Sequence, residues 1–146
     1  MNGIIPMNDT GSTGVIIERS LGAVCGEWLK FQYTGAGLSV TRRNLTSLAG
    51  SPKIIGGGLY VDNNLLASLK DVHNHITEIK GEFCALDNPI KSHVLGLLLI
   101  KGVTEVRLDK TEVQDILNRH LGKGRAGMLM AQEELIEAGF EKFAQL

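Results

Sequence analysis

The middle of the chain repeats one pattern of apolar residues at a spacing of 21 residues. The first copy consists of Leu38, Val40, Leu45 and Leu48, and the second of Leu59, Val61, Leu66 and Leu69. A weaker third copy, at a spacing of 24 residues, consists of Phe83, Ala85, Asn88 and Ile90, so three residues are inserted near His73. A unit this short cannot bury its apolar side alone, and we therefore expect successive units to stack on one shared core.

The first part of each unit alternates between apolar and other residues, which predicts a short strand with its apolar side chains pointing inward. The later leucines then carry the chain along the floor of the unit. An inward Asn, such as Asn64 or Asn88, can hydrogen-bond backbone groups that a turn leaves unpaired. Arg43 stands at this position in the first copy and does not suit it, so we expect the first unit to be an atypical edge.

This pattern is similar to that of the leucine-rich repeat, whose units run for about 20–29 residues. Residues 45–69, LTSLAGSPKIIGGGLYVDNNLLASL, resemble the short leucine-rich-repeat-like proteins of tailed bacteriophages, and residues 113–146 look like the helical tail that often follows those repeats. The third unit departs from that pattern, because residues 71–75 replace its turn of glycine and proline. The resemblance implies a phage protein that binds a host enzyme, a defence factor, a polymerase or another phage protein.

The length of 146 residues is about that of one domain. We expect an α/β protein rich in β structure, with an N-terminal arm and β cap at 1–34, a leucine-rich-repeat-like solenoid of three to four turns at 35–109, and a helical cap at 110–146. The net charge of -1 offers no chain-wide attraction to nucleic acid or membranes. Two cysteines, no signal-peptide pattern and no apolar run of membrane length predict a cytoplasmic protein. The resemblance to phage proteins implies that this is the cytoplasm of the host cell.

The segment before the repeats contains two short runs typical of strands, residues 15–17 and 29–33. The glycines of residues 35–37 predict a hairpin that leads from the second run into the first repeat. Residues 1–14 are rich in Gly, Asn, Asp and Thr, and we expect them to form a mobile arm.

The apolar stretch of residues 94–100 is too short for its periodicity to separate a buried helix from a strand. We favour a short helix capped by Ser92. After it, Val103, Val106 and Leu108 return to the strand pattern. A fourth parallel strand is therefore expected at this point.

Thr111 and Gln114 have the spacing of a capping box, in which the Thr side chain accepts from the Gln114 N–H and the Gln side chain reaches back. The helix that follows carries Val113, Ile116, Leu117 and Leu121 on one face and is expected to stop at Gly122. A second helix, from about Gly127 to Gly139, presents Met128, Ala131, Leu135 and Ile136 at helical spacing. We expect these helices to cover the open end of the repeats.

Catalytic or metal chemistry finds little support in the sequence, and we expect no cofactor and no enzyme activity. His73 and His75 would share one side of a strand, but no third or fourth metal ligand is apparent, so a surface loop is the simpler interpretation. Cys84 falls on the outward side of the third strand, and Cys25 has no neighbouring His that would activate it. A small hydrolase or metal enzyme is the third and least favoured class.

The strongest local concentration of positive charge is the glycine-rich segment of residues 119–127, which contains Arg119, Lys123 and Arg125. Just before a helix N-terminus, such a segment can hold an anion or a phosphate. The competing interpretation is a helix that ends at a glycine with solvated basic neighbours. Nucleic-acid binding through these three residues is the alternative function.

The residues that alternate with the inward ones are expected to form an outward ladder, with a rung about every 4.8 Å. The ladder carries Ser39 and Thr41, then Tyr60 and Asp62, then Cys84 and Leu86, then Arg107 and Asp109. An exposed Tyr and Leu among polar neighbours resemble the centre and rim of a protein-binding patch. We predict non-catalytic protein binding through Ser39, Thr41, Tyr60, Asp62, Leu86, Arg107 and Asp109, the competing interpretation being an ordinary solvated sheet face.

Overall fold

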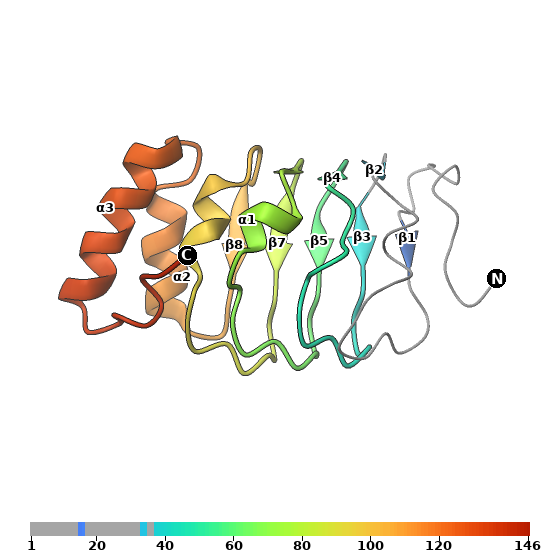
Figure 1. Ribbon diagram of the computed structural model, residues 1–146, viewed down its shortest axis with the longest axis horizontal. Helices are drawn as coiled ribbons and strands as arrows, with labels where there is room; N and C mark the ends of the chain where they lie inside the picture. Colours follow the sequence, from blue (N-terminus) through green and yellow to red (C-terminus); the bar gives the residue numbers. More distant parts are fainter. Residues whose placement is uncertain (1–14, 17–32, 35–36) are drawn as a thin grey trace.

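The structure is a computed structural model that describes residues 15–16, 33–34 and 37–146 (Figure 1). The arm expected at residues 1–14, and Cys25, lie outside these residues. The elements in chain order are β1 (Val15–Ile16), β2 (Tyr33–Thr34), β3 (Leu38–Ser39), β4 (Ile54–Ile55), β5 (Leu59–Tyr60), α1 (Val72–His75), β6 (Glu78–Ile79), β7 (Glu82–Cys84), the 3-10 helix η2 (Leu95–Leu99), β8 (Glu105–Arg107), α2 (Thr111–Arg119) and α3 (Gly124–Glu137). The protein is thus of mixed α/β content, as expected.

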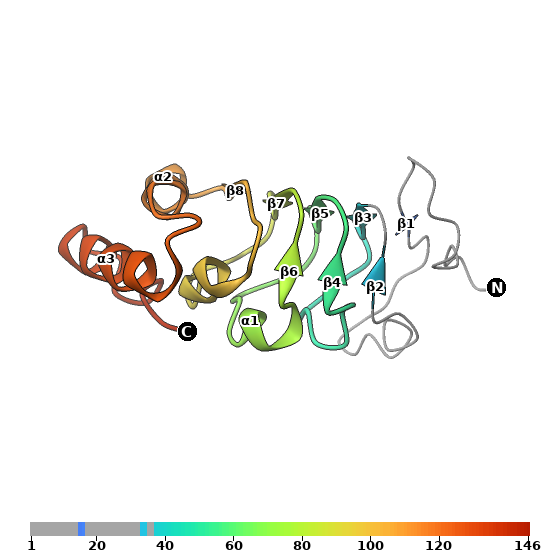
Figure 2. The same ribbon diagram turned by 90° about the horizontal axis from the view of Figure 1, so that it is seen from above.

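The strands form two parallel sheets that the chain visits alternately. One sheet has the order β1-β3-β5-β7-β8, and the other has the order β2-β4-β6. The second sheet is extended by a parallel bridge between Glu78 and Lys101. Each passage of the chain through both sheets is called a coil below, and Figure 2 shows the two sheets on different sides of the stacked coils.

The register of the five-stranded sheet follows the repeat found in the sequence. Leu38 pairs with Leu59, Leu59 with Phe83, and Phe83 with Val106. All four side chains are buried, with at most 2% of their surface exposed. The expected fourth parallel strand is confirmed as β8. The three extra residues of the third unit are absorbed by α1, which replaces part of the connection between β5 and β6.

The hairpin expected before the first repeat is wrong. β2 pairs in parallel with β4, whereas β3 pairs in parallel with β1 and β5, so β2 and β3 belong to different sheets. The physical reason is that the alternating coil path separates consecutive strands into opposite sheets. β1 and β2 therefore continue the two parallel sheets.

Buried asparagines connect consecutive coils, as the sequence predicts. The Asn64 Oδ1 accepts from the backbone N–H groups of Arg43 and Leu45, and its Nδ2 donates to the carbonyls of Val40 and Val61. Asn88 repeats this one coil later by accepting from the Leu66 N–H and donating to the Val61 carbonyl. At the equivalent position of the first unit, the backbone N–H of Arg43 donates to Asn64.

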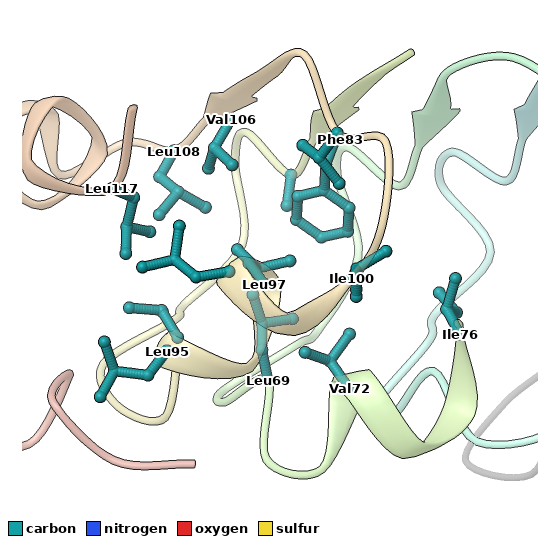
Figure 3. Packing of buried hydrophobic residues seen from close by; sticks show 14 of the residues in the cluster. Leu69, Val72, Ile76, Phe83, Leu95, Leu97, Ile100, Val106, Leu108 and Leu117 are labelled. Atoms are coloured by element: carbon teal, nitrogen blue, oxygen red, sulfur yellow. The ribbon is translucent and has the colours of Figure 1, made fainter. Parts of the chain in front are cut away.

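The segment of residues 94–100 forms the 3-10 helix η2, so the favoured helix is confirmed in a tighter form. Its cap differs from the expectation, because Val94 precedes it with no side-chain cap and the Ser92 hydroxyl contacts the His93 ring instead. Figure 3 shows Leu97 of this segment among Phe83, Leu108 and Leu69. η2 therefore fills the interior of the last coil with side chains.

The two C-terminal helices close the end of the five-stranded sheet, but not through the expected capping box. Lys110 precedes α2 and no side chain caps it, while the Gln114 Oε1 accepts from the Leu108 N–H. Asn118, which the sequence analysis did not single out, accepts from the Val106 N–H at 2.7 Å and donates to the Val106 carbonyl at 2.9 Å. Its amide thus pairs with the β8 edge as a further strand would.

α2 ends at Arg119, just before Gly122, and α3 begins at Gly124, three residues earlier than expected. The predicted inward residues Met128, Ala131 and Leu135 are buried, but Ile136 is 48% exposed. α3 contacts η2. After α3 the chain turns back toward the start of η2, where the Val94 N–H donates to the Phe143 carbonyl. Gly139, with φ of 88°, allows this reversal.

Candidate functional site

The outward side chains of β3, β5, β7 and β8 form one surface of three columns, called the outer face below. The middle column is fixed by strand register, which pairs Ser39 with Tyr60, Tyr60 with Cys84, and Cys84 with Arg107. Alternation along each strand places two further columns beside it. The first column is Gly37, Gly58, Glu82 and Glu105, and the third is Thr41, Asp62, Leu86 and Asp109.

The first column contributes two carboxylates that the sequence analysis missed. Glu82 and Glu105 are paired residues of β7 and β8. Both lie within 4 Å of the Arg107 guanidinium, Glu82 at 3.8 Å and Glu105 at 3.7 Å. The signal was available, because both residues lie two positions before predicted outward residues. Each lies one position before the inward residue of its strand, Phe83 or Val106, so the alternation identifies it once it is extended in that direction.

Tyr60 lies flat along its own strand because Gly58 leaves room for the ring. A side chain at Gly58 would begin only 2.8 Å from the Tyr60 hydroxyl. Burial, together with a hydrogen bond to the Glu82 carboxylate, raises the pKa of Tyr60. Tyr60 is half-buried on the outer face, with its hydroxyl beside Gly58 of its own strand and hydrogen-bonded to Glu82 of β7.

Cys84 occupies an outward position of its strand, as predicted, but it is only 5% exposed. Burial and a hydrogen bond to the Asp62 carboxylate raise the pKa of its thiol to about 12. A thiol with this pKa is protonated at neutral pH and is a weak nucleophile. Cys84 therefore forms the floor between Tyr60 and Arg107.

Two carboxylates of the third column form hydrogen bonds that stabilise the fold. The Asp62 Oδ1 accepts from the Leu86 N–H at 2.7 Å, and the Asp109 Oδ1 accepts from the Asp87 N–H at 3.0 Å. These bonds join neighbouring coils just beyond the strand ends. Leu86 is half-buried beside them, and Thr41 is half-buried on the first coil. Asp62 and Asp109 thus have a structural role besides any contact with a partner.

The outer face carries an excess of negative charge. The outer face has four carboxylates, of Asp62, Glu82, Glu105 and Asp109, and one guanidinium, of Arg107, which lies beside Glu82 and Glu105. Tyr60 and Leu86 lie among them on neighbouring coils. The arrangement is a small apolar centre with an acidic rim.

The three basic residues proposed for anion binding do not act as one free group. The Arg119 Nη2 is 2.6 Å from Glu134 Oε1 on α3, so this guanidinium is already paired. The other oxygen of Glu134 bonds to the Nε2 of His120, a buried residue of the same segment. Arg119 and His120 hold the pKa of the Glu134 carboxyl below its usual value. Lys123 and Arg125 are exposed at the start of α3.

His73 and His75 lie on the helical turn α1, so the expected surface loop is wrong, and the strand that the disfavoured metal site would have required is not present at these residues either. Residues two apart on a helix point in different directions, which removes the geometry of a shared metal ion. Burial and the neighbouring Lys53 lower the pKa of His75. Within the described part of the chain, no three His, Cys, Asp or Glu side chains are grouped to hold a metal ion.

Among the described helices, none is long and apolar enough to cross a membrane. No protein-family model, curated protein or solved structure matched the chain.

Proposed function

We propose that the chain is a non-catalytic protein-binding module, built as a short leucine-rich-repeat-like solenoid that presents its outer face to a partner protein. The observation that carries the proposal is the position of Tyr60 and Leu86 on neighbouring coils, inside a rim of polar and charged side chains. In Figure 2, none of the described helices lies over the outward side of β3, β5 and β7.

The dimensions of the outer face suit the centre of an interface. Four strands at about 4.8 Å and three columns along each strand cover about 14 Å by 14 Å. This is about a quarter of the 800 Å² that each partner buries in a standard complex. Binding energy concentrates in such a central patch, above all on aromatic and Arg side chains. Tyr60 and Arg107 are the side chains of this kind on the outer face.

The charge of the outer face indicates the chemistry of the partner. An apolar centre with four carboxylates and one guanidinium fits a protein surface that offers an apolar side chain ringed by Lys or Arg. The resemblance to tailed-phage proteins supports a protein of the infected host, such as an enzyme, a defence factor or a polymerase. Association with such a partner is expected to weaken as salt rises.

A non-catalytic role agrees with the chemical state of the polar groups on the outer face. The Cys84 thiol, with a pKa of about 12, offers no thiolate at neutral pH. The Asp62 carboxylate accepts a backbone N–H of the next coil and the Asp109 carboxylate accepts one of the preceding coil, which engages groups that could otherwise serve as a base.

The test uses the purified chain as bait in host lysate, identification of the captured protein, and measurement of its affinity for variants. We expect Tyr60→Ala combined with Leu86→Ala to weaken binding at least tenfold while the thermal melt is retained. Leu65→Ala is the matched control, because Leu65 is 53% exposed and lies outside the outer face. Unchanged affinity in the double variant, or equal loss in the control, would refute the proposal.

A second arm of the test addresses nucleic acid. Retention of DNA or RNA at about 50 mM salt that is lost in Lys123→Ala combined with Arg125→Ala would assign the function to the basic segment instead. We expect no such retention, since Arg119 is already paired with Glu134.

A further inference from the structure

The two parallel sheets end differently next to the C-terminal helices. In the five-stranded sheet, the N–H and C=O of Val106 are both bonded to the Asn118 amide, which closes the edge of β8. The second sheet ends at Lys101, beside β6. The Lys101 N–H donates to the Thr77 carbonyl, and the Lys101 carbonyl accepts from the Ile79 N–H.

These two bonds fix the direction of the backbone groups on either side of Lys101. In a trans peptide unit the C=O and the N–H point in opposite directions, and the described part of the chain has no cis peptide bond. The Ile100 C=O and the Gly102 N–H therefore point away from β6. Neither group forms a hydrogen bond with another described residue. The edge thus presents an acceptor and a donor of the kind that an added strand uses.

A groove of about 390 Å³, called the edge groove below, runs along this open edge. Residues 98–102 form one wall, and Gly122 and Gly124 of the α2–α3 connection form the other. Figure 2 shows the chain after η2 beside β6, with the α2–α3 connection on its other side. Ile100 is only 5% exposed and its side chain lies in the core (Figure 3), so its backbone is what borders the edge groove.

The edge groove has room for a short piece of extended chain. A strand occupies about 3.3 Å along its axis, about 4.8 Å toward its neighbour and about 10 Å between packed layers, which is about 160 Å³ per residue. The volume of the edge groove therefore corresponds to about two or three residues. Because Gly122 and Gly124 have no side chains, the far wall leaves this space open.

The charged side chains at the edge groove are mainly basic. Lys101 lines it, Lys123 lies between its two glycines, and Arg125 follows them, all three being exposed. Glu78, the register partner of Lys101, supplies one carboxylate on the β6 side. A Lys at a sheet edge disfavours pairing with an arbitrary strand. An added strand is therefore expected to place an acidic residue opposite Lys101.

We propose that the edge groove binds an extended peptide segment of a partner protein, in which an acidic residue is followed by an apolar one. The acidic residue donates its N–H to the Ile100 carbonyl, and its own carbonyl accepts from the Gly102 N–H. One residue thus satisfies both groups of the edge, as Lys101 does for β6. The peptide adds a parallel strand to the sheet of β2, β4 and β6.

The two side chains of the peptide then meet matching surroundings. The carboxylate lies beside Lys101, which continues the alternation of charge that begins with Glu78. The apolar residue that follows points to the opposite side of the sheet, in line with Ile55 and Ile79, which are both fully buried. Leu99, half-buried in the wall of the edge groove, is its contact.

The primary test is an amide NMR titration of the full chain with a short, end-blocked peptide of alternating Glu and Val. Two backbone hydrogen bonds and one exposed ion pair predict a dissociation constant of about 0.1–1 mM. We expect shifts of the amide signals of Lys101, Gly102, Gly122 and Gly124. The Gly102 N–H is expected to move farthest downfield, because it gains an acceptor.

N-methylated peptides test the strand pairing without altering the protein. Methylation of the Glu nitrogens removes the N–H that donates to Ile100 and is expected to weaken binding at least tenfold. Methylation of the Val nitrogens is the matched control, because these N–H groups point away from the edge and their loss is expected to change the affinity less than threefold. Equal losses with the two peptides would overturn the proposal.

Charge reversal tests the role of Lys101. Lys101→Glu is expected to weaken peptide binding at least tenfold. Lys91→Glu is the matched control, since Lys91 is also exposed and does not line the edge groove. Circular dichroism melts check that both variants fold. Tyr60→Ala combined with Leu86→Ala is expected to leave peptide binding unchanged, so the edge groove and the outer face are tested separately.

Three results would contradict the assignment of a peptide to the edge groove. The first is the absence of a Gly102 shift at about 2 mM peptide. The second is equal affinity of Lys101→Glu and the unaltered chain. The third is a short oligonucleotide that shifts these amide signals while the peptide does not, which would assign the basic residues to nucleic acid instead.

Discussion

Asn64→Ala tests the bond that joins one coil to the next. Asn64 is 4% exposed and its amide holds backbone groups of two coils. The substitution leaves the Leu45 N–H and the Val40 carbonyl buried without this partner. The Val61 carbonyl keeps its bond from Asn88, and the Arg43 N–H is only partly buried, so water can replace its acceptor.

The magnitude follows from counting the buried groups that lose their partner. Each such group costs about 1–3 kcal/mol, so the two in Asn64→Ala are expected to lower the free energy of unfolding by about 4 kcal/mol. Asn88→Ala leaves one comparable group, the Leu66 N–H, and is expected to cost about 2 kcal/mol. Asn74→Ala, at an exposed position on α1, is the matched control and is expected to cost less than about 0.5 kcal/mol.

The assay is urea unfolding followed by circular dichroism. With a slope of about 2 kcal/mol per molar urea, the midpoint is expected to fall by about 2 M for Asn64→Ala and by about 1 M for Asn88→Ala. A loss below about 1 kcal/mol for Asn64→Ala, or a larger loss for Asn88→Ala, would show that the asparagines do not connect the coils as described.

Four further outcomes are expected. Asn118→Leu frees the β8 edge, costs about 2 kcal/mol and increases aggregation, which unfolding and light scattering detect. Gly81→Ala brings a Cβ to 2.7 Å from the Gly58 nitrogen and should cost about 1–3 kcal/mol, measured by thermal melts. Pairing lowers the folded-state pKa of Glu134, so the wild-type chain should be more stable than Glu134→Gln above a pH of about 4.5. This difference should be lost as the pH falls through the lower pKa of the folded state, as thermal melts across pH would show. Iodoacetamide at pH 8 should modify Cys84, mapped by mass spectrometry, only when urea unfolds the chain, because its thiol pKa is about 12. No difference from wild type in the three variants, or modification of Cys84 in the folded chain, would contradict the corresponding interpretation.

The parts of the fold that the sequence predicts are those with a repeated signal. Leu38, Leu59 and Phe83 recur in the same context, so the register of β3, β5 and β7 could be derived by alignment of the chain with itself. The inward asparagines were recognisable for the same reason, because a polar residue recurs within an apolar pattern. Burial of the repeated positions enforces this register, since a slip by one residue would expose them.

The second sheet could not be predicted because its strands carry no repeated apolar pattern. Ile54 and Ile55 give no alternation to detect, and β6 pairs with them through Glu78 and Ile79. The position of β2 in that sheet depends on the path of the whole coil, which local patterns do not contain. The helical turn α1 was missed because four residues with two His have no helical periodicity.

The candidate site was predicted in outline, since alternation alone identifies Tyr60 and Arg107 as outward. The sequence could not predict which outward residues already form contacts within the protein. Asp62 bonds to the backbone of the next coil, Cys84 is buried by its neighbours, and Arg119 is paired across two helices. Each of these contacts joins residues at least fifteen positions apart, so only the three-dimensional arrangement brings them together.

The stacking of coils in one register is the claim on which the outer face and its proposed partner depend. Methyl NOE spectroscopy of a Leu- and Val-labelled sample with protonated Phe rings tests it in solution. We expect cross-peaks between the methyl groups of Leu38 and Leu59, and from Leu59 to the ring of Phe83. Assigned resonances that lack these cross-peaks, or that show Leu59 against a different strand, would contradict the account.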